Sequence, residues 1–492
     1  MKLSFEKIRN IVISILLIIF CQLTINLPFK LKLEQNFWFI VIGVVLYFII
    51  TDFHKKEKLA KNAFFLILIF GSVVALNRPV QYGLDEETHL ENAIGISDSL
   101  FFKYSKEDIS DYDAVLIHDG IRNQKNFQGD DYWYSVEHKD SKISGKPIGF
   151  DNPAYIPGMI GWNLGRLISN KVYVSYYLGR IFHVLAYALL VFFAIKLGRA
   201  YKELIYLLGT LPSTIYIISS YHYDYLYFGM SLLLIALLTN ILSGYTKITN
   251  KIAIAFQAMV LPFAFAKFPF VLAGSLLSIL SEKYYETRKV RWLSTGLFFL
   301  NMLFALLFAG FIRVFDTTAS VAGERPSIFY FIRHPFPVIR TLLNAPSAIL
   351  DNFVSRPLQY IAKDSPLLIT MTAIFFVVCL FVISIQTKVK LSPAFKLFTV
   401  SLFIGIAALL AYAMTGDPRV YTPGSIWIGG VQGRYYFLMI TFLPLFLGDF
   451  LHRKFEIRPF SEQESNFFTG ILQYGITFLV IFTMGVALYT QI

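Results

Sequence analysis

The chain has 492 residues, of which 56% are hydrophobic and only 15% are charged, and it contains 49 Phe and 29 Tyr. A soluble domain of this length does not need so much apolar surface, and the apolar residues form runs long enough to cross about 30 Å of hydrocarbon. The net charge of +12 comes from basic residues in short clusters between these runs. This pattern is a membrane-topology signal and argues against a nucleic-acid-binding stripe.

Hydropathy predicts an all-α integral membrane protein with about 13 transmembrane helices. The first apolar run lacks a small-residue cleavage site and another span follows at once, so we interpret it as a retained span and not as a signal peptide. The thirteen spans are expected to start near Ile11, Phe37, Ala63, Val172, Glu203, Tyr225, Ile252, Phe268, Leu293, Leu367, Ala394, Tyr435 and Phe468.

The segment over residues 252–280 is interrupted by Pro262 and Pro269. It is either one span or two half-length helices that meet at Lys267, and interrupted helices of this kind are tolerated in membranes where they line a cavity. Cys21 and Cys379 lie inside apolar runs, so no disulfide framework is expected.

Charge distribution predicts the orientation. In the thirteen-span arrangement 22 of the 44 basic residues lie in short loops on one side, which the positive-inside rule makes cytoplasmic. The other side receives three long loops, residues 78–171, 316–366 and 415–432, and the first of them holds 15 of the 32 acidic residues. We therefore expect a two-span extension over residues 1–62 and a transmembrane core over residues 63–492 with outward-facing loops.

Parts of these loops have the pattern of helices that lie in the membrane interface. Asn152 and Pro153 resemble an N-cap followed by Pro at the first helical position, and residues 335–350 and 349–361 look similar to the segment that follows. The buried side of the helix after Pro153 would consist of Met159, Ile160, Trp162, Leu164 and Leu167.

The most acidic stretch opens the first outer loop, directly after the third span, with the sequence GLDEETHLE. If a helix is capped near Asp85, then Asp85 and His89 share one face at a spacing of four residues. Acidic groups at the mouth of a span are costly unless they are solvated or used. The alternative is that Asp85 and Glu86 only cap a helix.

A resemblance appears when these pieces are taken in order. The pieces are GLDEETH, NPAYIPGMIGWNLGRLI, YYLGR, LPSTIYIISSYHYDYLYFGMSLLL, AFAKFPF, HPF and GGVQGRYYFLMITFLPLFL. Their order resembles a bacterial family of polytopic membrane proteins of unknown function that is grouped with the GT-C glycosyltransferases. Two features depart from it: the two spans before Ala63 are additional, and Leu84 replaces the usual Pro before the acidic pair. The resemblance implies a GT-C-like bundle and a sugar donor linked to a polyprenyl phosphate, such as undecaprenyl phosphate.

The residues support a related chemistry on their own. An outward-facing site has no access to nucleotide sugars, and the chain has no Gly-rich phosphate loop, so a lipid-linked donor is expected. Transfer of its sugar needs a carboxylate to deprotonate the acceptor hydroxyl. Asp85 is the candidate base, and Glu86 or His89 would position it or the acceptor. His89 is expected to be a structural partner of Asp85 and not a metal ligand.

The departing phosphate needs cations. Arg434 is the first candidate, because Arg can bind phosphate with two parallel hydrogen bonds; Lys267 and Arg180 are second choices. Arg434 as an interfacial anchor is the alternative. The substrate cavity is expected to include Tyr221, His222, Asp224 and Gln432, although aromatic residues at a span end usually form the interfacial belt.

No cofactor is required by this scheme. Asp111, Tyr112 and Asp113 form a DxD pattern associated with metal-bound sugar nucleotides, but such a match arises easily in so acidic a loop, and a divalent metal has no other support. His118 and His138 are expected to be solvated loop residues.

Three function classes remain at this point. The preferred class is a glycosyltransferase of the bacterial cytoplasmic membrane that moves a sugar from a polyprenyl-phosphate donor to a cell-envelope glycan on the outer face. The second is a polysaccharide polymerase or ligase that acts on lipid-linked glycans. The third is a lipid-linked-sugar transporter or flippase, which should carry its ionisable residues inside the spans. The expected partners are the donor, the glycan acceptor and the bilayer, with no nucleic acid.

Overall fold

The fold is that of a computed structural model that describes residues 4–29, 36–53, 56–78, 80, 83, 85–100, 131–138, 152–315, 326–359, 364–387, 389–458 and 460–490. These residues are nearly all helical and form no strand; two isolated bridges join Glu137 to Lys171 and Ile248 to Tyr285. The prediction of an all-α protein is confirmed. The DxD pattern at residues 111–113 and His118 lie outside the described residues.

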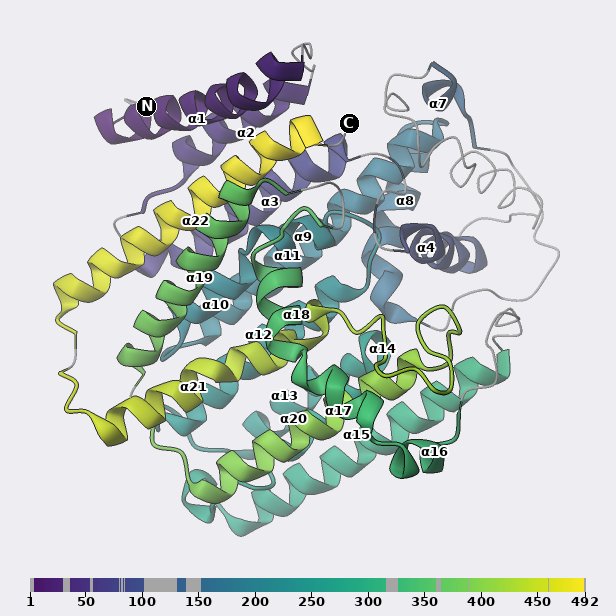
Figure 1. Ribbon diagram of the computed structural model, residues 1–492, viewed down its shortest axis with the longest axis vertical. Helices are drawn as coiled ribbons and strands as arrows, with labels where there is room; N and C mark the ends of the chain where they lie inside the picture. The colour runs from purple at the N-terminus through teal and green to yellow at the C-terminus, as the bar shows by residue number, and fades with distance from the viewer. Residues whose placement is uncertain are drawn as a thin grey trace.

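The elements carry the labels of Figure 1. In chain order they are α1 (Phe5–Phe29), α2 (Asn36–Ile50), η1 (Lys56–Lys58), α3 (Leu59–Asn77), α4 (Glu86–Leu100), α7 (Asp131–Ser135), η3 (Pro153–Tyr155), α8 (Ile156–Ile168), α9 (Val172–Leu197), α10 (Lys202–Gly209), α11 (Pro212–Ile218), α12 (Asp224–Leu242), α13 (Asn250–Val260), α14 (Phe263–Ala266), η4 (Phe268–Leu276), η5 (Glu282–Tyr284), α15 (Arg288–Phe315), α16 (Ile328–Arg333), α17 (Phe336–Leu343), α18 (Ala345–Ile349), η6 (Leu350–Val354), α19 (Pro366–Gln386), α20 (Pro393–Met414), η7 (Gly433–Tyr436), α21 (Phe437–Lys454) and α22 (Glu462–Thr490).

Within the described ranges, eight helices are long and apolar enough to cross a membrane, and two further apolar helices are shorter. The count of 13 spans is therefore not confirmed, although each of the thirteen expected segments contains helical structure. The eight are Lys56–Asn77, Val172–Leu197, Asp224–Leu242, Arg288–Ala309, Pro366–Gln386, Pro393–Met414, Gly433–Lys454 and Glu462–Ala487; the shorter two are Phe37–Ile50 and Asn250–Ala266.

Two of the expected spans are interrupted. The segment that starts near Glu203 consists of α10 and α11, which Thr210 and Leu211 separate, and Pro212 is the first residue of α11. Residues 250–276 form α13, α14 and then a 3₁₀ helix, with a non-helical Lys267 (φ −143°, ψ 83°) at the junction. The structure thus has two helical segments that meet at Lys267, and not one span. Proline accounts for both breaks because it lacks a backbone N–H and clashes with the preceding turn.

The long helices have two ends with different chemistry. In Figure 1, α4, α7, α8 and α16 gather at one end, opposite the turn between α21 and α22. At the turn's end Lys56 forms an ion pair with Glu203 and donates a hydrogen bond to Ser465. At the other end Lys267 and Arg434 contact Asp224. Lys56, Glu203 and Ser465 therefore meet at one end of the bundle, and Asp224, Lys267 and Arg434 meet at the other.

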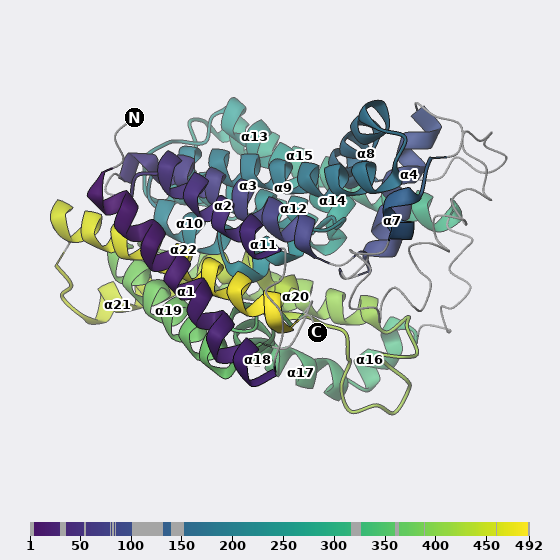
Figure 2. The same cartoon turned by 90° about the horizontal axis from the view of Figure 1, so that it is seen from above.

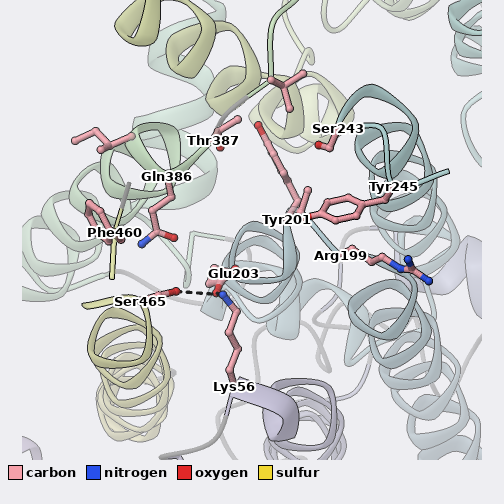
Figure 3. A pocket seen from close by; sticks show the side chains of 13 residues that line it. Lys56, Arg199, Tyr201, Glu203, Ser243, Tyr245, Gln386, Thr387, Phe460 and Ser465 are labelled. Atoms are coloured by element: carbon pink, nitrogen blue, oxygen red, sulfur yellow. Dashed lines mark hydrogen bonds and ion pairs between the residues drawn. The ribbon is translucent and has the colours of Figure 1, made fainter. Parts of the chain in front are cut away.

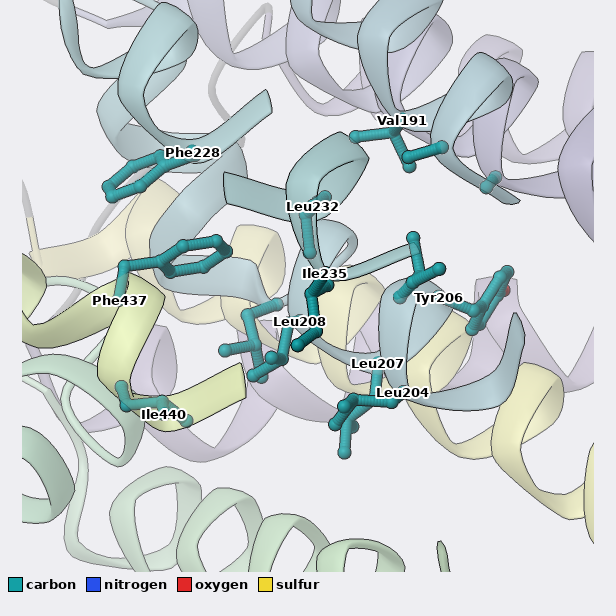
Figure 4. Packing of buried hydrophobic residues seen from close by; sticks show 14 of the residues in the cluster. Val191, Leu204, Tyr206, Leu207, Leu208, Phe228, Leu232, Ile235, Phe437 and Ile440 are labelled. Carbon is teal, nitrogen blue, oxygen red and sulfur yellow. The ribbon is translucent and has the colours of Figure 1, made fainter. Parts of the chain in front are cut away.

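Close packing centres on α9, α10, α12 and α21. Figure 4 shows Val191, Leu208, Leu232 and Phe437 within one continuous buried cluster. In a bilayer the hydrophobic effect does not drive helices together, so their association depends on such van der Waals packing and on interhelical hydrogen bonds.

Helix α8 packs against α9 through glycine. A Cβ atom on Gly161 would lie 2.4 Å from the Leu178 carbonyl oxygen, and one on Gly165 would lie 2.3 Å from the Ser175 Cα atom. The expected buried side is partly wrong for this reason. Met159 and Trp162 are buried, but the other three predicted residues are exposed: Ile160, Leu164 and Leu167. The positions of Gly161 and Gly165, and not those of the apolar residues alone, determine which face of α8 contacts α9.

Helices α1, α2 and α22 come from the two ends of the sequence and pack together (Figures 1 and 2). Polar contacts join them to each other and to α3. Asn62 of α3 donates to the Gln473 side chain at 2.6 Å, and the Tyr47 and Thr477 hydroxyls are 3.4 Å apart. Buried polar contacts of this kind fix the register between membrane helices.

Short helices occupy the second outer loop. Helices α16, α17 and α18 and the π-helix η6 cover most of residues 328–354, and several large apolar side chains on them are exposed, including Phe329, Phe336 and Leu343. The presence of helices in this loop agrees with the sequence pattern. Their location in a membrane interface stays a prediction.

Candidate functional site

Asp85 lies directly before α4, in the segment that follows α3. Its carbonyl oxygen accepts a hydrogen bond from the His89 N–H at 3.2 Å, so it occupies the expected start of the helix. Its backbone has φ +49°, a left-handed conformation that is uncommon for residues other than glycine. The side chain is exposed. Backbone strain of this kind concentrates at functional sites, which makes Asp85 a candidate on structural grounds as well.

Glu86 and Arg180 form a buried ion pair between α4 and α9. Arg180 Nε and Nη2 donate to the two Glu86 carboxylate oxygens at 2.8 and 2.7 Å, and Arg180 Nη1 donates to the carbonyls of Ala75 and Arg78, both at 2.9 Å. Glu86 also accepts the Tyr221 backbone N–H. Burial alone would raise the pKa of Glu86, but the charges of Arg180 and Arg78 together with the hydrogen bonds from Arg180 and the Tyr221 N–H outweigh it and hold the pKa below its usual value. The ion pair therefore fixes the position of the start of α4 relative to α9.

Replacing Glu86 by glutamine should destabilise the protein by about 3–5 kcal/mol, because Arg180 would be left as a buried charge without its counter-ion. The measurement is the thermal unfolding midpoint in detergent. Glu137→Gln is the matched control, since Glu137 forms an exposed ion pair with Lys171 and such pairs contribute little. Equal midpoints for the two variants would contradict a structural role for the buried pair.

Asp224 is the centre of a second buried cluster. Lys267 Nζ lies 3.0 Å from its Oδ1 atom and Arg434 Nη1 lies 3.2 Å from its Oδ2 atom. Asp224 is completely buried, and Lys267 and Arg434 are 6% and 2% exposed. Neither Asp224 oxygen makes a hydrogen bond of good geometry within the described residues. Its place in the first turn of α12 adds a favourable interaction with the helix dipole.

Tyrosine rings surround Lys267. Its Nζ atom lies 4.2, 4.8 and 5.7 Å from the ring centroids of Tyr435, Tyr223 and Tyr227. The faces of these rings are electron-rich and stabilise a cation. Because the chain breaks at Lys267, the side chain projects from the junction of two helical segments and not from the side of a continuous helix.

His222 connects Asp224 to Arg434. Its Nδ1 atom faces the backbone N–H of Asp224 at 3.0 Å and its Nε2 atom faces Arg434 Nη1 at 3.2 Å. Burial lowers the pKa of His222 well below its usual value, so the ring is neutral. A neutral imidazole accepts a hydrogen bond at only one nitrogen, and both neighbours here are donors. The two contacts therefore compete, and an anionic oxygen beside Arg434 would relieve that competition.

His89 lies between Tyr155 and His222 and contacts both. Its Nδ1 atom and the Tyr155 hydroxyl are 2.6 Å apart, and its ring centroid lies 4.3 Å from that of His222. The pKa of Tyr155 is raised, mainly by burial and further by the charges of Asp224 and Asp85. The expectation that His89 pairs with Asp85 thus needs correction: their backbones are hydrogen-bonded, but the His89 side chain bonds to Tyr155.

Acid should destabilise the protein through its buried histidines. Burial lowers the pKa of His89 to about 3 and that of His138, whose Nε2 atom contacts Ser175, to about 4. Between these values and the ~6.5 of an unfolded histidine, the unfolded chain binds more protons than the folded protein does. The free energy of unfolding therefore decreases as the pH is lowered, by up to about 1.4 kcal/mol per pH unit for each histidine. His138 is also buried and not the solvated residue that the sequence suggests.

We therefore expect the thermal midpoint to decrease from about pH 6.5 towards pH 4, and His138→Gln to reduce that dependence. The pH dependence of the midpoint is compared between the wild type and His138→Gln, because Asp364 has the opposite effect on stability. Burial raises the pKa of Asp364 to about 6, so its protonation favours the folded state as the pH is lowered. Identical pH dependences for the wild type and His138→Gln would show that folding does not lower the pKa of His138.

Comparison with known proteins identifies the family. The family model described as "Predicted membrane protein (DUF2142)" matches residues 65–444, more than half of the chain. The chain belongs to the DUF2142 family. No curated protein and no solved structure matches the chain.

The DUF2142 match contains every candidate residue and leaves α1, α2 and α22 entirely outside it. The structure gathers five of the predicted residues in the Asp224 cluster: His89, His222, Asp224, Lys267 and Arg434.

Three other predicted residues lie beside this cluster in the buried ion pair and its contacts: Glu86, Arg180 and Tyr221. Gln432 is half-buried and its Oε1 atom has no hydrogen bond within the described ranges. Tyr221, His222 and Asp224 are at most 1% exposed, so a substrate reaches them only if the groups that cover them move.

Two residues of this DUF2142 site were missed by the sequence interpretation. Tyr155 is the partner of His89, and Arg78 is a buried cation that donates to the Tyr216 carbonyl at 2.7 Å. Tyr155 could have been found from its position just after the Asn152 cap, which the structure confirms through the Ala154 N–H. The sequence signal for Arg78 was weaker than that for Tyr155, and consisted only of its position at the end of a predicted span. Within the described residues, no group of three His, Cys, Asp or Glu is arranged to hold a metal ion.

Proposed function

We propose that this DUF2142 protein is a membrane glycosyltransferase of the bacterial cytoplasmic membrane. It transfers a sugar from a polyprenyl-phosphate donor to a cell-envelope glycan, at a site that faces outward. The observation that carries the proposal is the convergence of Lys267 and Arg434 on the single carboxylate of Asp224, at the end of the bundle that also carries the exposed carboxylate of Asp85.

The cluster has the composition of a phosphate site. Two buried cations face one carboxylate, and a phosphodiester oxygen beside Arg434 would accept the N–H that now faces His222. Buried cations are stabilised by anions, and fixed cations lower the energy of charge that develops on a leaving group. The Arg180 guanidinium is completely buried and engaged by Glu86 and two carbonyls, so the proposal assigns it a structural role and leaves the phosphate to Arg434 and Lys267.

Asp85 takes the part of general base in this proposal. The acceptor hydroxyl oxygen attacks the anomeric carbon of the donor sugar, its proton passes to the Asp85 carboxylate, and the bond between the anomeric carbon and the phosphate oxygen breaks. The electron pair of that bond leaves with the polyprenyl phosphate, beside Lys267 and Arg434. His89 and Tyr155, held together at 2.6 Å, line the path between the base and the cations and orient the acceptor.

The test is transfer of radiolabelled sugar from a polyprenyl-phosphate donor to envelope glycan by the purified protein in liposomes. We expect transfer that depends on the protein and releases polyprenyl phosphate in equal amount. Release of polyprenyl diphosphate from a diphosphate-linked glycan would favour a polymerase or ligase. Movement of the donor across the liposome bilayer without transfer would indicate a transporter, and either result would overturn the proposal.

A further inference from the structure

Tyr223 is the most accessible of the three tyrosines whose rings surround Lys267. Tyr227 is completely buried and its hydroxyl donates to the Tyr435 carbonyl at 2.8 Å, and Tyr435 is 8% exposed. Tyr223 is half-buried, and its ring centroid lies 4.8 Å from the Lys267 Nζ atom. Of the three rings, Tyr223 is therefore the one that offers the most surface to a ligand at Lys267.

Tyr223 also lies between the two sides of the proposed site. Its ring centroid is 4.9 Å from that of His89, in the first turn of α4, and 4.9 Å from that of its neighbour His222. Helix α4 begins directly after Asp85. A donor whose phosphate lies at Lys267 and whose sugar lies towards Asp85 would therefore extend along the Tyr223 ring.

The local backbone presents this ring without fixing it by a hydrogen bond. Tyr223 is the residue directly before α12, with φ −72° and ψ −9°, and its side chain does not cap the helix. Its hydroxyl has no hydrogen-bond partner in the described part of the chain, whereas the Tyr155 hydroxyl lies 2.6 Å from the His89 Nδ1 atom. The position of the Tyr223 ring therefore depends on its contacts with Lys267 and with the two histidine rings.

Lys267 is stabilised differently from a lysine at the opposite end of the bundle. Lys56 forms an ion pair with the Glu203 carboxylate (Figure 3). Lys267 instead shares the Asp224 carboxylate with Arg434, so two buried cations face one anion. The surrounding rings add stabilisation, because the face of an aromatic ring attracts a cation but carries no net charge. A second carboxylate would neutralise Lys267, whereas the rings leave its charge available to an anion.

We propose that Tyr223 is a positioning residue of this site: its ring holds the Lys267 ammonium, through the cation–π contact, at the place where the donor phosphate binds. This role rests on the proposed function, because it takes the polyprenyl-phosphate donor as the ligand of Lys267. Phosphate binding then depends on the electrostatic attraction of the Tyr223 ring for Lys267, and not only on the size of the ring.

The test replaces Tyr223 by phenylalanine and by phenylalanines that carry one, two or three fluorine atoms on the ring. Fluorine withdraws electron density from the ring face and weakens the cation–π contact, while the ring keeps nearly the same size. We expect Tyr223→Phe to keep kcat/KM for the donor within about twofold of the wild type, because it retains the ring. Fluorination should then lower kcat/KM stepwise, by about tenfold in total for the trifluorinated ring.

The same series at Tyr284 is the matched control. The Lys283 Nζ atom lies 4.9 Å from the Tyr284 ring centroid, nearly the distance between Lys267 and Tyr223, and Tyr284 is also half-buried. Neither Lys283 nor Tyr284 belongs to the Asp224 cluster. Fluorination at Tyr284 should therefore leave kcat/KM for the donor unchanged.

A second readout does not require sugar transfer. The affinity of the same proteins for farnesyl phosphate is measured from the increase of the thermal unfolding midpoint in detergent. We expect the dissociation constant to rise about tenfold along the Tyr223 series and to stay constant along the Tyr284 series.

The two readouts separate the role of Tyr223 from the proposed function. A wild type that binds farnesyl phosphate with the expected fluorine dependence, but transfers no sugar, would refute the transferase and support the role of Tyr223 at a phosphate site. The role of Tyr223 is overturned if neither readout changes along its series, or if both readouts change as much along the Tyr284 series.

Discussion

Replacing Asp85 by asparagine should reduce the rate of sugar transfer by about 10²–10⁴-fold, the usual contribution of a general base. The variant keeps the size and shape of the side chain and removes its ability to take a proton. Because the Asp85 side chain is exposed and its hydrogen bond to α4 is made by its backbone carbonyl, folding and membrane insertion should be unaffected. The measurement is the initial rate of transfer by matched amounts of each protein in liposomes.

Asp351→Asn is a suitable control for this experiment. Asp351 is an exposed carboxylate in the second outer loop, paired with Arg356, and has no part in the proposed chemistry. Its substitution should leave the rate within about twofold, since exposed ion pairs contribute little. If Asp85→Asn transfers sugar as fast as Asp351→Asn, Asp85 is not the base. The enzyme proposal would then lose its central residue.

Replacing Arg434 by alanine should reduce transfer by about 10²–10³-fold, a loss typical for removal of one group that stabilises charge in the transition state. The fold should persist, because Asp224 retains Lys267 as its counter-ion at 3.0 Å. Arg434→Lys should recover only part of the rate, since a lysine supplies the charge but not two parallel N–H groups. The measurement is the rate of transfer as a function of donor concentration.

Arg356→Ala provides the corresponding control, because Arg356 is a partly exposed arginine that forms an ion pair with Asp351 and is not one of the residues of the Asp224 cluster. Full activity of Arg434→Ala would remove this residue from phosphate binding. An unfolded Arg434→Ala protein would be recognised by its gel-filtration profile, and Arg434→Lys would then decide the question.

The helical character of the chain and most of its long apolar helices could be predicted, because they follow from local properties of the sequence. Runs of apolar residues mark the long helices, and basic clusters mark the loops that share one end. The same reasoning brought Asp224, Lys267 and Arg434 to one end, although they are far apart in the sequence. The break at Lys267 was also visible, since Pro262 and Pro269 flank it.

The partners of individual side chains could not be predicted. Glu86 and Arg180 are 94 residues apart, and they meet because α4 packs against α8, which in turn packs against α9. The sequence shows two acidic neighbours, Asp85 and Glu86, with nothing to indicate that one is exposed and the other is completely buried. Asp85 also adopts a left-handed backbone conformation, which Asp tolerates better than most residues but which the sequence alone does not predict.

The count of thirteen spans is not confirmed for a related reason. Hydropathy detects an apolar segment but not its continuity, so α10 and α11 read as one helix, and the 3₁₀ helix η4 reads as a span. Helix α8 shows the same limit on a smaller scale, because close approach of backbones at Gly161 and Gly165 outweighs the larger apolar residues in choosing the buried face.

The packing of α22 between early and late parts of the chain has a consequence for biogenesis. Asn10 of α1 bonds to Tyr474 of α22, 464 residues away, and Asn62 bonds to Gln473 of the same helix. Chains are synthesised from the N-terminus, so α1, α2 and α3 enter the bilayer long before α22 exists. Until it arrives, these helices keep polar side chains in the lipid without their native partners. The assembly is therefore completed only after synthesis of α22, and a nascent chain stalled before that point should be an early target for membrane proteases.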